Sequence, residues 1–139
     1  MTDTQLATDQ LFRDGQTARL NGEYDIAITV FQQVIDIRPS FAQAHMELGL
    51  ALCYIGDFDA SLRELAQAVE LAPMYAECHL QLAKVYTMLG MYSEGAAMFR
   101  IVLTLTDPQD KLYEEAAKQL SYFKDLALDD TGDTQANDY

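Results

Sequence analysis

The sequence repeats itself with a period of 34 residues, and this periodicity constrains the fold more than any other feature. Three kinds of residue recur at this spacing: a glycine, an aromatic residue two positions later, and a bulky apolar residue seven positions after that. They are Gly22, Gly56 and Gly90; Tyr24, Phe58 and Tyr92; and Phe31, Leu65 and Phe99. A proline follows each segment, at Pro39, Pro73 and, one residue out of step, Pro108. A fixed period of this size predicts a solenoid, in which each repeat is stable only when packed on its neighbours.

Each repeat is expected to form two helices. Apolar residues recur three and four positions apart, which is typical of a helix with one buried face. Glycine ends the first helix of each pair, and the second helix stops before the proline. The predicted helices are residues 6–20, 24–38, 41–54, 58–71, 75–88 and 92–105. Asp107 and Pro108 predict the N-cap and first turn of a seventh helix, to about Ala127.

The repeated pattern resembles the tetratricopeptide repeat family. The first helices carry an apolar residue followed by a small one at Leu48-Gly49 and Leu82-Ala83, and the first repeat keeps only Gly15. The second helices carry a small residue and, four positions on, a large one: Ala27 and Phe31, Ser61 and Leu65, Gly95 and Phe99. The sequence departs from the family pattern in having no tryptophan, in its histidines at His45 and His79, and in Asp14, which stands where an apolar residue is expected.

The resemblance implies an all-α fold of seven helices, wound as a right-handed α-α superhelix with a concave groove lined by the first helix of each pair. It divides the chain into a frayed N-terminus (1–7), three repeats (8–41, 42–75 and 76–109), a capping helix (110–128) and a disordered acidic tail (129–139). Members of the family typically bind a peptide or helix of a partner protein in the groove.

The charge balance favours some partners over others. The chain has 22 acidic and nine basic residues, a net charge of −13. Such a field repels nucleic acid and anionic membranes, so a basic partner is expected, although excess charge also serves solubility. No stretch approaches the roughly 20 apolar residues of a membrane span. The first residues lack the pattern of a signal peptide, which predicts a cytoplasmic location.

Ten side chains map onto the groove face of the first helices and are the candidate binding residues. They are Phe12, Gln16, Arg19, Leu20, Met46, Leu50, Tyr54, Leu80, Lys84 and Met88. Methionine and aromatic residues on such a face suit an adaptable hydrophobic binding site. The alternative is that the capping helix or a second copy of the chain covers these residues as core.

The carboxylate clamp known from this family is not expected. It uses lysine, asparagine and arginine to hold the C-terminal carboxylate of heat-shock chaperones. Here Phe12 stands in place of the first lysine, Gln16 and Glu47 replace the asparagines, and Glu77 and Gln81 replace the last lysine and arginine. The two carboxylates would repel the carboxylate of the ligand.

Catalytic, metal and cofactor sites are not expected either. His45 and His79 occupy the same position in successive repeats, and no cysteine or carboxylate completes a tetrahedral set around them. Cys53 and Cys78 are predicted to be about 13 Å apart along their helices, too far for a disulfide. The adjacent carboxylates Glu114 and Glu115 are interpreted as solvated.

The sequence therefore predicts a protein-interaction adaptor. Two alternatives remain open: a secretion-type chaperone for hydrophobic export substrates, and a self-assembling scaffold whose groove takes a neighbouring copy.

Overall fold

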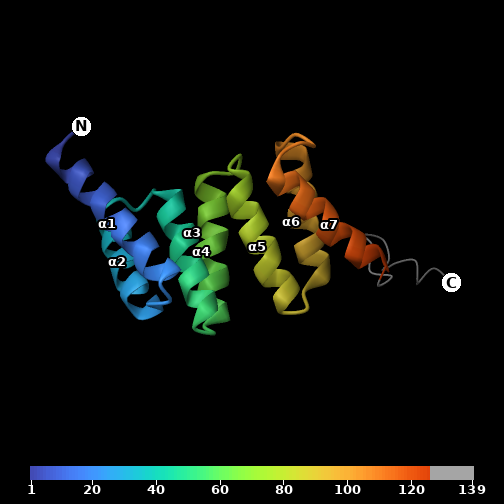
Figure 1. Cartoon of the computed structure of the whole chain (residues 1–139), viewed down its shortest axis with the longest axis horizontal. Coiled ribbons are helices and arrows are strands. Elements are labelled where there is room, and N and C mark those ends of the chain that lie inside the picture. Colours follow the sequence, from blue (N-terminus) through green and yellow to red (C-terminus); the bar gives the residue numbers. More distant parts are fainter. Residues whose placement is uncertain (126–139) are drawn as a thin grey trace. The chain divides into compact units, whose positions relative to one another are not determined.

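The computed structural model describes residues 1–125, which form seven α-helices (Figure 1). They are α1 (Asp3–Leu20), α2 (Tyr24–Ile37), α3 (Ala42–Tyr54), α4 (Phe58–Leu71), α5 (Ala76–Met88), α6 (Tyr92–Leu105) and α7 (Lys111–Asp125). The predicted all-α fold of paired helices is confirmed. The chain divides into two compact units: an N-terminal unit, Met1–Ala72, containing α1–α4, and a C-terminal unit, Pro73–Tyr139, containing α5–α7.

The three repeating glycines end the first helix of each pair as predicted. Gly22, Gly56 and Gly90 have φ angles of 79°, 88° and 79°, in the left-handed region that glycine adopts without a steric penalty. At the first of them, the amide of Glu23 donates to the carbonyl oxygen of Ala18 at 2.8 Å, and the same bond recurs in the other two turns. These bonds satisfy carbonyl groups that a helix end otherwise leaves without partners.

A glycine on the first helix faces a large residue on the second in the first two helix pairs. A Cβ atom added to Gly15 would lie 2.6 Å from Cε1 of Phe31, and one added to Gly49 would lie 2.7 Å from Cγ of Leu65. Both large side chains are fully buried. The small residues that the repeat pattern places on the first helices therefore let the second helices approach closely.

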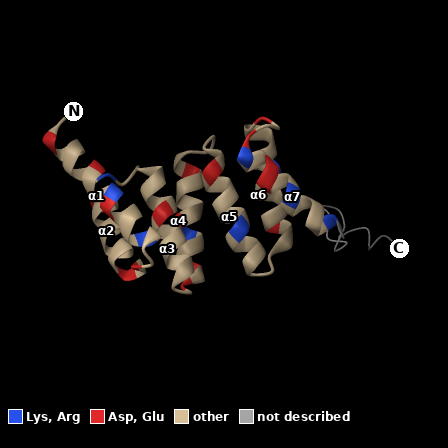
Figure 2. Cartoon of the chain, viewed as in Figure 1, with Lys and Arg blue, Asp and Glu red and all other residues tan. Residues whose placement is uncertain are grey.

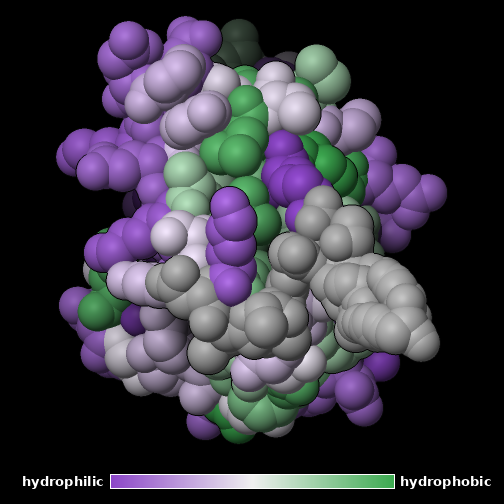
Figure 3. Space-filling view, turned by 90° about the vertical axis from the view of Figure 1, so that its right-hand side faces the viewer, coloured by the Kyte–Doolittle hydropathy of each residue, from purple (hydrophilic) through white to green (hydrophobic). Residues whose placement is uncertain are grey.

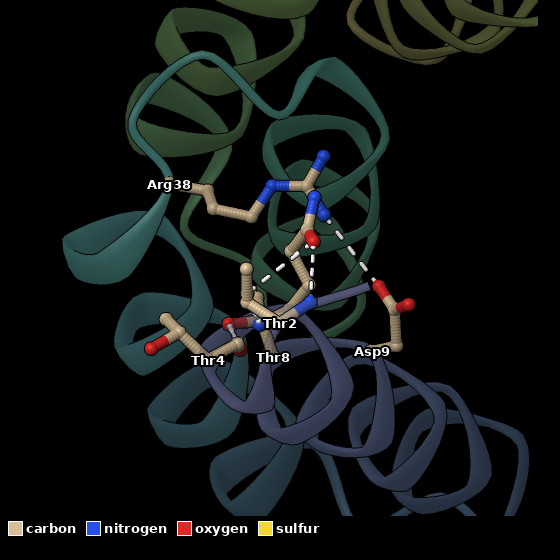
Figure 4. Close-up of polar contacts among 6 residues, drawn as sticks. Thr2, Thr4, Thr8, Asp9 and Arg38 are labelled. Atoms are coloured by element: carbon tan, nitrogen blue, oxygen red, sulfur yellow. Dashed lines mark hydrogen bonds and ion pairs between the residues drawn. The ribbon is translucent and has the colours of Figure 1, made fainter.

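Helix α1 begins earlier than the sequence indicates. Residues 1–7 are expected to be frayed, yet the helix starts at Asp3 because Thr2 and Gln5 form a reciprocal capping box (Figure 4). The Thr2 side chain accepts from the amide of Gln5 at 3.0 Å, and the Gln5 side chain accepts from the amide of Thr2 at 2.9 Å. Further along the helix, Asp9 forms an ion pair with Arg38 at 3.5 Å, which ties α1 to the end of α2.

Helix α7 begins later than predicted, and Asp110 caps it instead of Asp107. Residues 107–110 form a turn in which the amide of Asp110 donates to the carbonyl oxygen of Asp107 at 2.8 Å. The Asp110 side chain then accepts from the amide of Leu112 at 2.9 Å. Through Ala116 and Phe123, α7 packs into the core of the C-terminal unit. The predicted end of this helix at 128 and the predicted tail at 129–139 lie outside the described residues.

Replacing Gly49 with alanine should destabilise the N-terminal unit. The added methyl group would lie 2.7 Å from Leu65 Cγ and 3.2 Å from the backbone oxygen of Ser61. Overpacking of this kind costs about 1–3 kcal/mol, which outweighs the helix propensity of about 1 kcal/mol that alanine adds. Urea denaturation followed by circular dichroism measures the change. Leu65→Ala in the Gly49→Ala background should cost less than the sum of the single changes, and additive costs would contradict the contact.

Candidate functional site

A buried carboxylate joins the first helices of the N-terminal unit. The side chain of Glu47 on α3 is only 5% exposed. Its Oε1 lies 2.5 Å from Nε of Arg19, and its Oε2 accepts from Nε2 of Gln16 at 3.0 Å. Gln16 and Arg19, both predicted binding residues on α1, are therefore brought together by Glu47. The sequence signal for this contact is the opposite charge of Glu47 and Arg19.

Three of the predicted apolar residues are exposed at equivalent positions, the last residue of each first helix. Leu20 is 75% exposed, Tyr54 is 61% exposed and Met88 is 60% exposed. Tyr54 stacks on Tyr24 of α2, with ring centroids 4.9 Å apart and an interplanar angle of 8°. Leu50, one turn before Tyr54 on α3, is half-buried. The end of α3 and the start of α2 thus carry an aromatic pair that solvent reaches.

The other apolar candidates belong to the packed interior. Met46 is 6% exposed and Leu80 is 1% exposed, so neither presents a surface. Leu80 lies in the core cluster that also contains Phe123 of α7. Phe12 is half-buried, and its ring contacts Phe41 at 4.8 Å. The capping helix therefore covers part of α5, as the alternative interpretation expects.

Lys84 is also engaged with the capping helix. Its Nζ lies 3.1 Å from Oε2 of Glu115 on α7. Both side chains are more than a third exposed, so water screens this ion pair and it contributes little to stability. In the view of Figure 3, hydrophobic side chains are visible near the middle of this face and hydrophilic ones mainly at its edges.

The residues at the clamp positions bind each other. Gln16 donates to Glu47, as described above, and Nε2 of Gln81 donates to Oε2 of Glu77 at 2.7 Å. Each carboxylate that replaces a clamp residue therefore has an internal partner. This arrangement is the opposite of a clamp, which needs donors that await a carboxylate.

The two histidines connect α3 and α5 to the proline that precedes each of these helices. Nε2 of His45 donates to the carbonyl oxygen of Pro39 at 2.7 Å, and Nε2 of His79 donates to that of Pro73 at 2.8 Å. The other ring nitrogen of His45 lies 2.8 Å from Oε1 of Glu64. In His79 the same nitrogen is buried without a partner, because Met98 stands one repeat after Glu64. Within residues 1–125, no group of histidine, cysteine and carboxylate side chains is placed to hold a metal ion.

The thiols of both cysteines are less acidic than usual because of burial. Burial raises the pKa of Cys78 to about 12, and the negative charge of Glu77 adds to the rise. Burial also raises the pKa of Cys53. Because the thiolate is the nucleophile, neither position favours thiol chemistry.

Family models match most of the repeat region. A model described as TPR repeat matches residues 15–53, and a model described as Tetratricopeptide repeat matches residues 51–110. Together the two matches extend over more than half of the chain. No curated protein sequence matches the chain. Among the described helices, none combines the length and apolar character needed to cross a membrane.

Solved structures share the fold at low sequence identity. The TPR domain of Arabidopsis OM64 superposes with a TM-score of 0.76 at 21% identity, covering 86% of this chain and 98% of that one. The first TPR of Spaghetti (RPAP3), bound to the HSP90 peptide SRMEEVD, gives 0.78 at 20% identity over 90% and 95%. The Yersinia enterocolitica type III secretion translocator chaperone SycD gives 0.78 at 16% identity over 83% and 88%. At these identities the likeness shows the fold alone.

Replacing His45 with leucine should cost more stability than replacing His79 with leucine. Replacing His45 removes two hydrogen bonds and leaves Glu64 without its partner. Replacing His79 removes one hydrogen bond, and it also removes a buried ring nitrogen that has no hydrogen-bond partner. The difference should be about 1 kcal/mol, measured by urea denaturation. Equal costs would show that the His45–Glu64 contact adds nothing.

The thiol of Cys78 should resist a water-soluble disulfide reagent in the folded protein at pH 8. With a pKa of about 12 the group is almost entirely protonated there, and its side chain is fully buried. In denaturant both cysteines should react rapidly. Stopped-flow absorbance on the Cys53→Ser variant isolates Cys78, and rapid reaction of the folded variant would contradict the assignment.

Proposed function

The chain belongs to the tetratricopeptide repeat family, and on this premise we propose that it is an adaptor that binds a peptide or helix of a partner protein on its first helices. Three repeats and the capping helix α7 supply the scaffold. We propose a cytoplasmic location and no catalytic role. The proposal that the protein has no catalytic role is supported by Cys78, because its nucleophilic side chain is buried and has a raised pKa.

The exposed residues at the ends of α1 and α3 are the observation that carries this proposal. Leu20 and Tyr54 remain 75% and 61% exposed. By contrast, Ala18 of α1 and Leu48 and Ala51 of α3 are buried in the core. Burying a side chain of this size against a partner contributes roughly 1.5–3 kcal/mol. Leu50 extends the same face of α3 by one turn.

The polar residues beside them are already held in place. Gln16 and Arg19 are fixed by Glu47, so a partner that contacts them does not need to order them first. Pre-organisation of this kind lowers the entropic cost of association. The same network argues against a ligand that ends in a free carboxylate, because the clamp positions carry Glu47 and Glu77 instead of donors. We therefore assign the surface to an internal segment of the partner.

A chaperone for hydrophobic export substrates is the second candidate. The turn between α5 and α6 exposes Met88, Leu89 and Met91, and methionine adapts its shape to different apolar partners. A self-assembling scaffold is the third candidate. Sedimentation at increasing concentration separates it from the others, since a strict monomer excludes it.

Changing Leu50 and Tyr54 together to glutamate should abolish capture of the partner. The two charges would fall on the apolar surface that the proposal assigns to the partner, where a buried charge without an opposite charge is strongly unfavourable. Affinity capture from the native cell extract, with mass spectrometry, identifies the partner and measures its loss.

The matched control is Gln33→Glu with Gln67→Glu. These residues are exposed on α2 and α4 at equivalent positions, and the pair adds the same charge away from the first helices. Circular dichroism checks that both variants keep their helicity. If the Leu50 and Tyr54 variant still captures the same proteins, the surface is assigned wrongly.

A further inference from the structure

Two turns of the N-terminal unit lie side by side and expose apolar side chains. The stack of Tyr24 on Tyr54 brings the turn between α1 and α2 against the turn between α3 and α4. Besides the exposed Leu20 and Tyr54, these turns and the first turn of α2 expose Ile26 and Ile55. We call this surface, formed by residues 20–26 and 54–59, the turn edge.

Four carboxylates surround the apolar side chains of the turn edge. They are Glu23, Asp25, Asp57 and Asp59, and all four are exposed. None of them forms an ion pair with another residue in the range 1–125. Figure 2 shows the acidic colour at the lower turns of both helix pairs of the N-terminal unit. The turn edge is therefore an apolar surface with a negative rim, and the carboxylates of this rim form no ion pair within the described residues.

Helix formation accounts for only part of this charge. Asp57 caps α4 by accepting from the amide of Ala60 at 3.3 Å, and acids in a first turn interact favourably with the helix dipole. Glu23, however, makes no side-chain cap bond. In the third repeat, Met91 stands at the position of Glu23 and Asp57, and Ser93 at that of Asp25 and Asp59.

The third repeat lacks acids at these two positions but carries Glu94 in the first turn of α6, where α2 and α4 carry Asp25 and Asp59. The helix dipole therefore accounts for one acid in the first turn of each second helix. It does not account for Glu23, which precedes α2, makes no side-chain cap bond and corresponds to Met91. The placement of all four acids of the turn edge beside exposed leucine, isoleucine and tyrosine side chains points to a ligand.

We propose that the turn edge binds a cationic amphipathic segment of a partner protein, in which lysine or arginine side chains flank apolar ones. The proposal rests on the function proposed above, because Leu20 and Tyr54 belong to both surfaces. The apolar side chains supply the buried area, and the carboxylates attract and orient a basic segment and exclude an acidic one. A second copy of this chain is disfavoured as the occupant of the turn edge, since two molecules of net charge −13 repel each other.

The test uses a fluorescent peptide of leucine and lysine that forms a cationic amphipathic helix. A peptide with glutamate in place of each lysine is the negative probe. The variant carries Glu23→Gln, Asp25→Asn and Asp59→Asn, and it keeps Asp57 because that residue caps α4. Loss of three favourable charge contacts should weaken binding of the cationic peptide about tenfold, measured by fluorescence anisotropy.

The control variant removes the same amount of charge elsewhere on the same unit. It carries Asp14→Asn, Asp36→Asn and Glu70→Gln, all exposed, and two of these residues lie at the opposite ends of α2 and α4. Binding by the control should remain within about twofold of the parent, since exposed charges beyond a Debye length of about 10 Å are largely screened. Equal weakening by both variants would show that only the total charge matters, and would overturn the proposal.

A second measurement tests the apolar contribution and the location. Leu20→Asn with Ile55→Asn should weaken binding about tenfold, and raised salt should not remove that loss. In the unmodified protein, chemical-shift changes on adding the peptide should concentrate in residues 20–26 and 54–59. Shifts elsewhere, or binding of the glutamate peptide with equal affinity, would overturn the proposal.

The two proposals fail in different ways. If the variant with glutamate at positions 50 and 54 still captures the partner, the adaptor surface is assigned wrongly, whatever the result of peptide binding. If the variant without the turn-edge acids binds the cationic peptide as well as the parent does, the proposal of a cationic partner is wrong, even if partner capture is lost.

Discussion

The close approach of a small residue on one helix to a large residue on the next is the contact on which the rest of this structure depends. Where Gly15 meets Phe31 and Gly49 meets Leu65, there is no room for a Cβ atom. The chain reverses in a tight turn after each first helix, and a left-handed glycine makes this turn possible. The positions of Leu20 and Tyr54, at the ends of the first helices, follow from this geometry.

The features that depend on local backbone chemistry could be predicted from the sequence. The bounds of α4 and α6 agree with the repeat to the residue, because glycine, proline and apolar spacing act within a few positions. The start of α7 could not be read in this way. Asp107 and Asp110 are both good N-caps, and the turn that joins them decides between the two.

The burial of individual side chains was harder to predict than the helices that carry them. Met46 and Leu80 fall on the face that the repeat assigns to the groove, yet both are buried. Leu80 is covered through its cluster with α7, an element outside the repeat, so a rule based on equivalent repeat positions cannot anticipate it. The burial of Glu47 was equally hard to predict, because this carboxylate is buried through its contacts with Arg19 and Gln16 on another helix.

Positions that differ between repeats are more informative about function than positions that agree. The agreeing residues maintain the backbone, so each has an explanation in packing or turn geometry. Glu64 becomes Met98 one repeat later, and its loss leaves a ring nitrogen of His79 without a partner. Met91 stands at the position of Glu23, and α6 still forms with a single first-turn acid, Glu94. Because Glu23 makes no side-chain cap bond, α2 does not depend on its charge, and that charge is available for a partner.

The location of the acidic residues matters more than their total. At physiological ionic strength the Debye length is about 8 Å, so a partner at the turn edge responds mainly to the carboxylates within about one helix diameter. The remaining negative charge acts on solubility and on the long-range approach of any basic molecule. Selectivity must then come from the few positions where carboxylates surround exposed apolar side chains. At the proposed turn edge those positions are Glu23, Asp25, Asp57 and Asp59, near the exposed Leu20 and Tyr54.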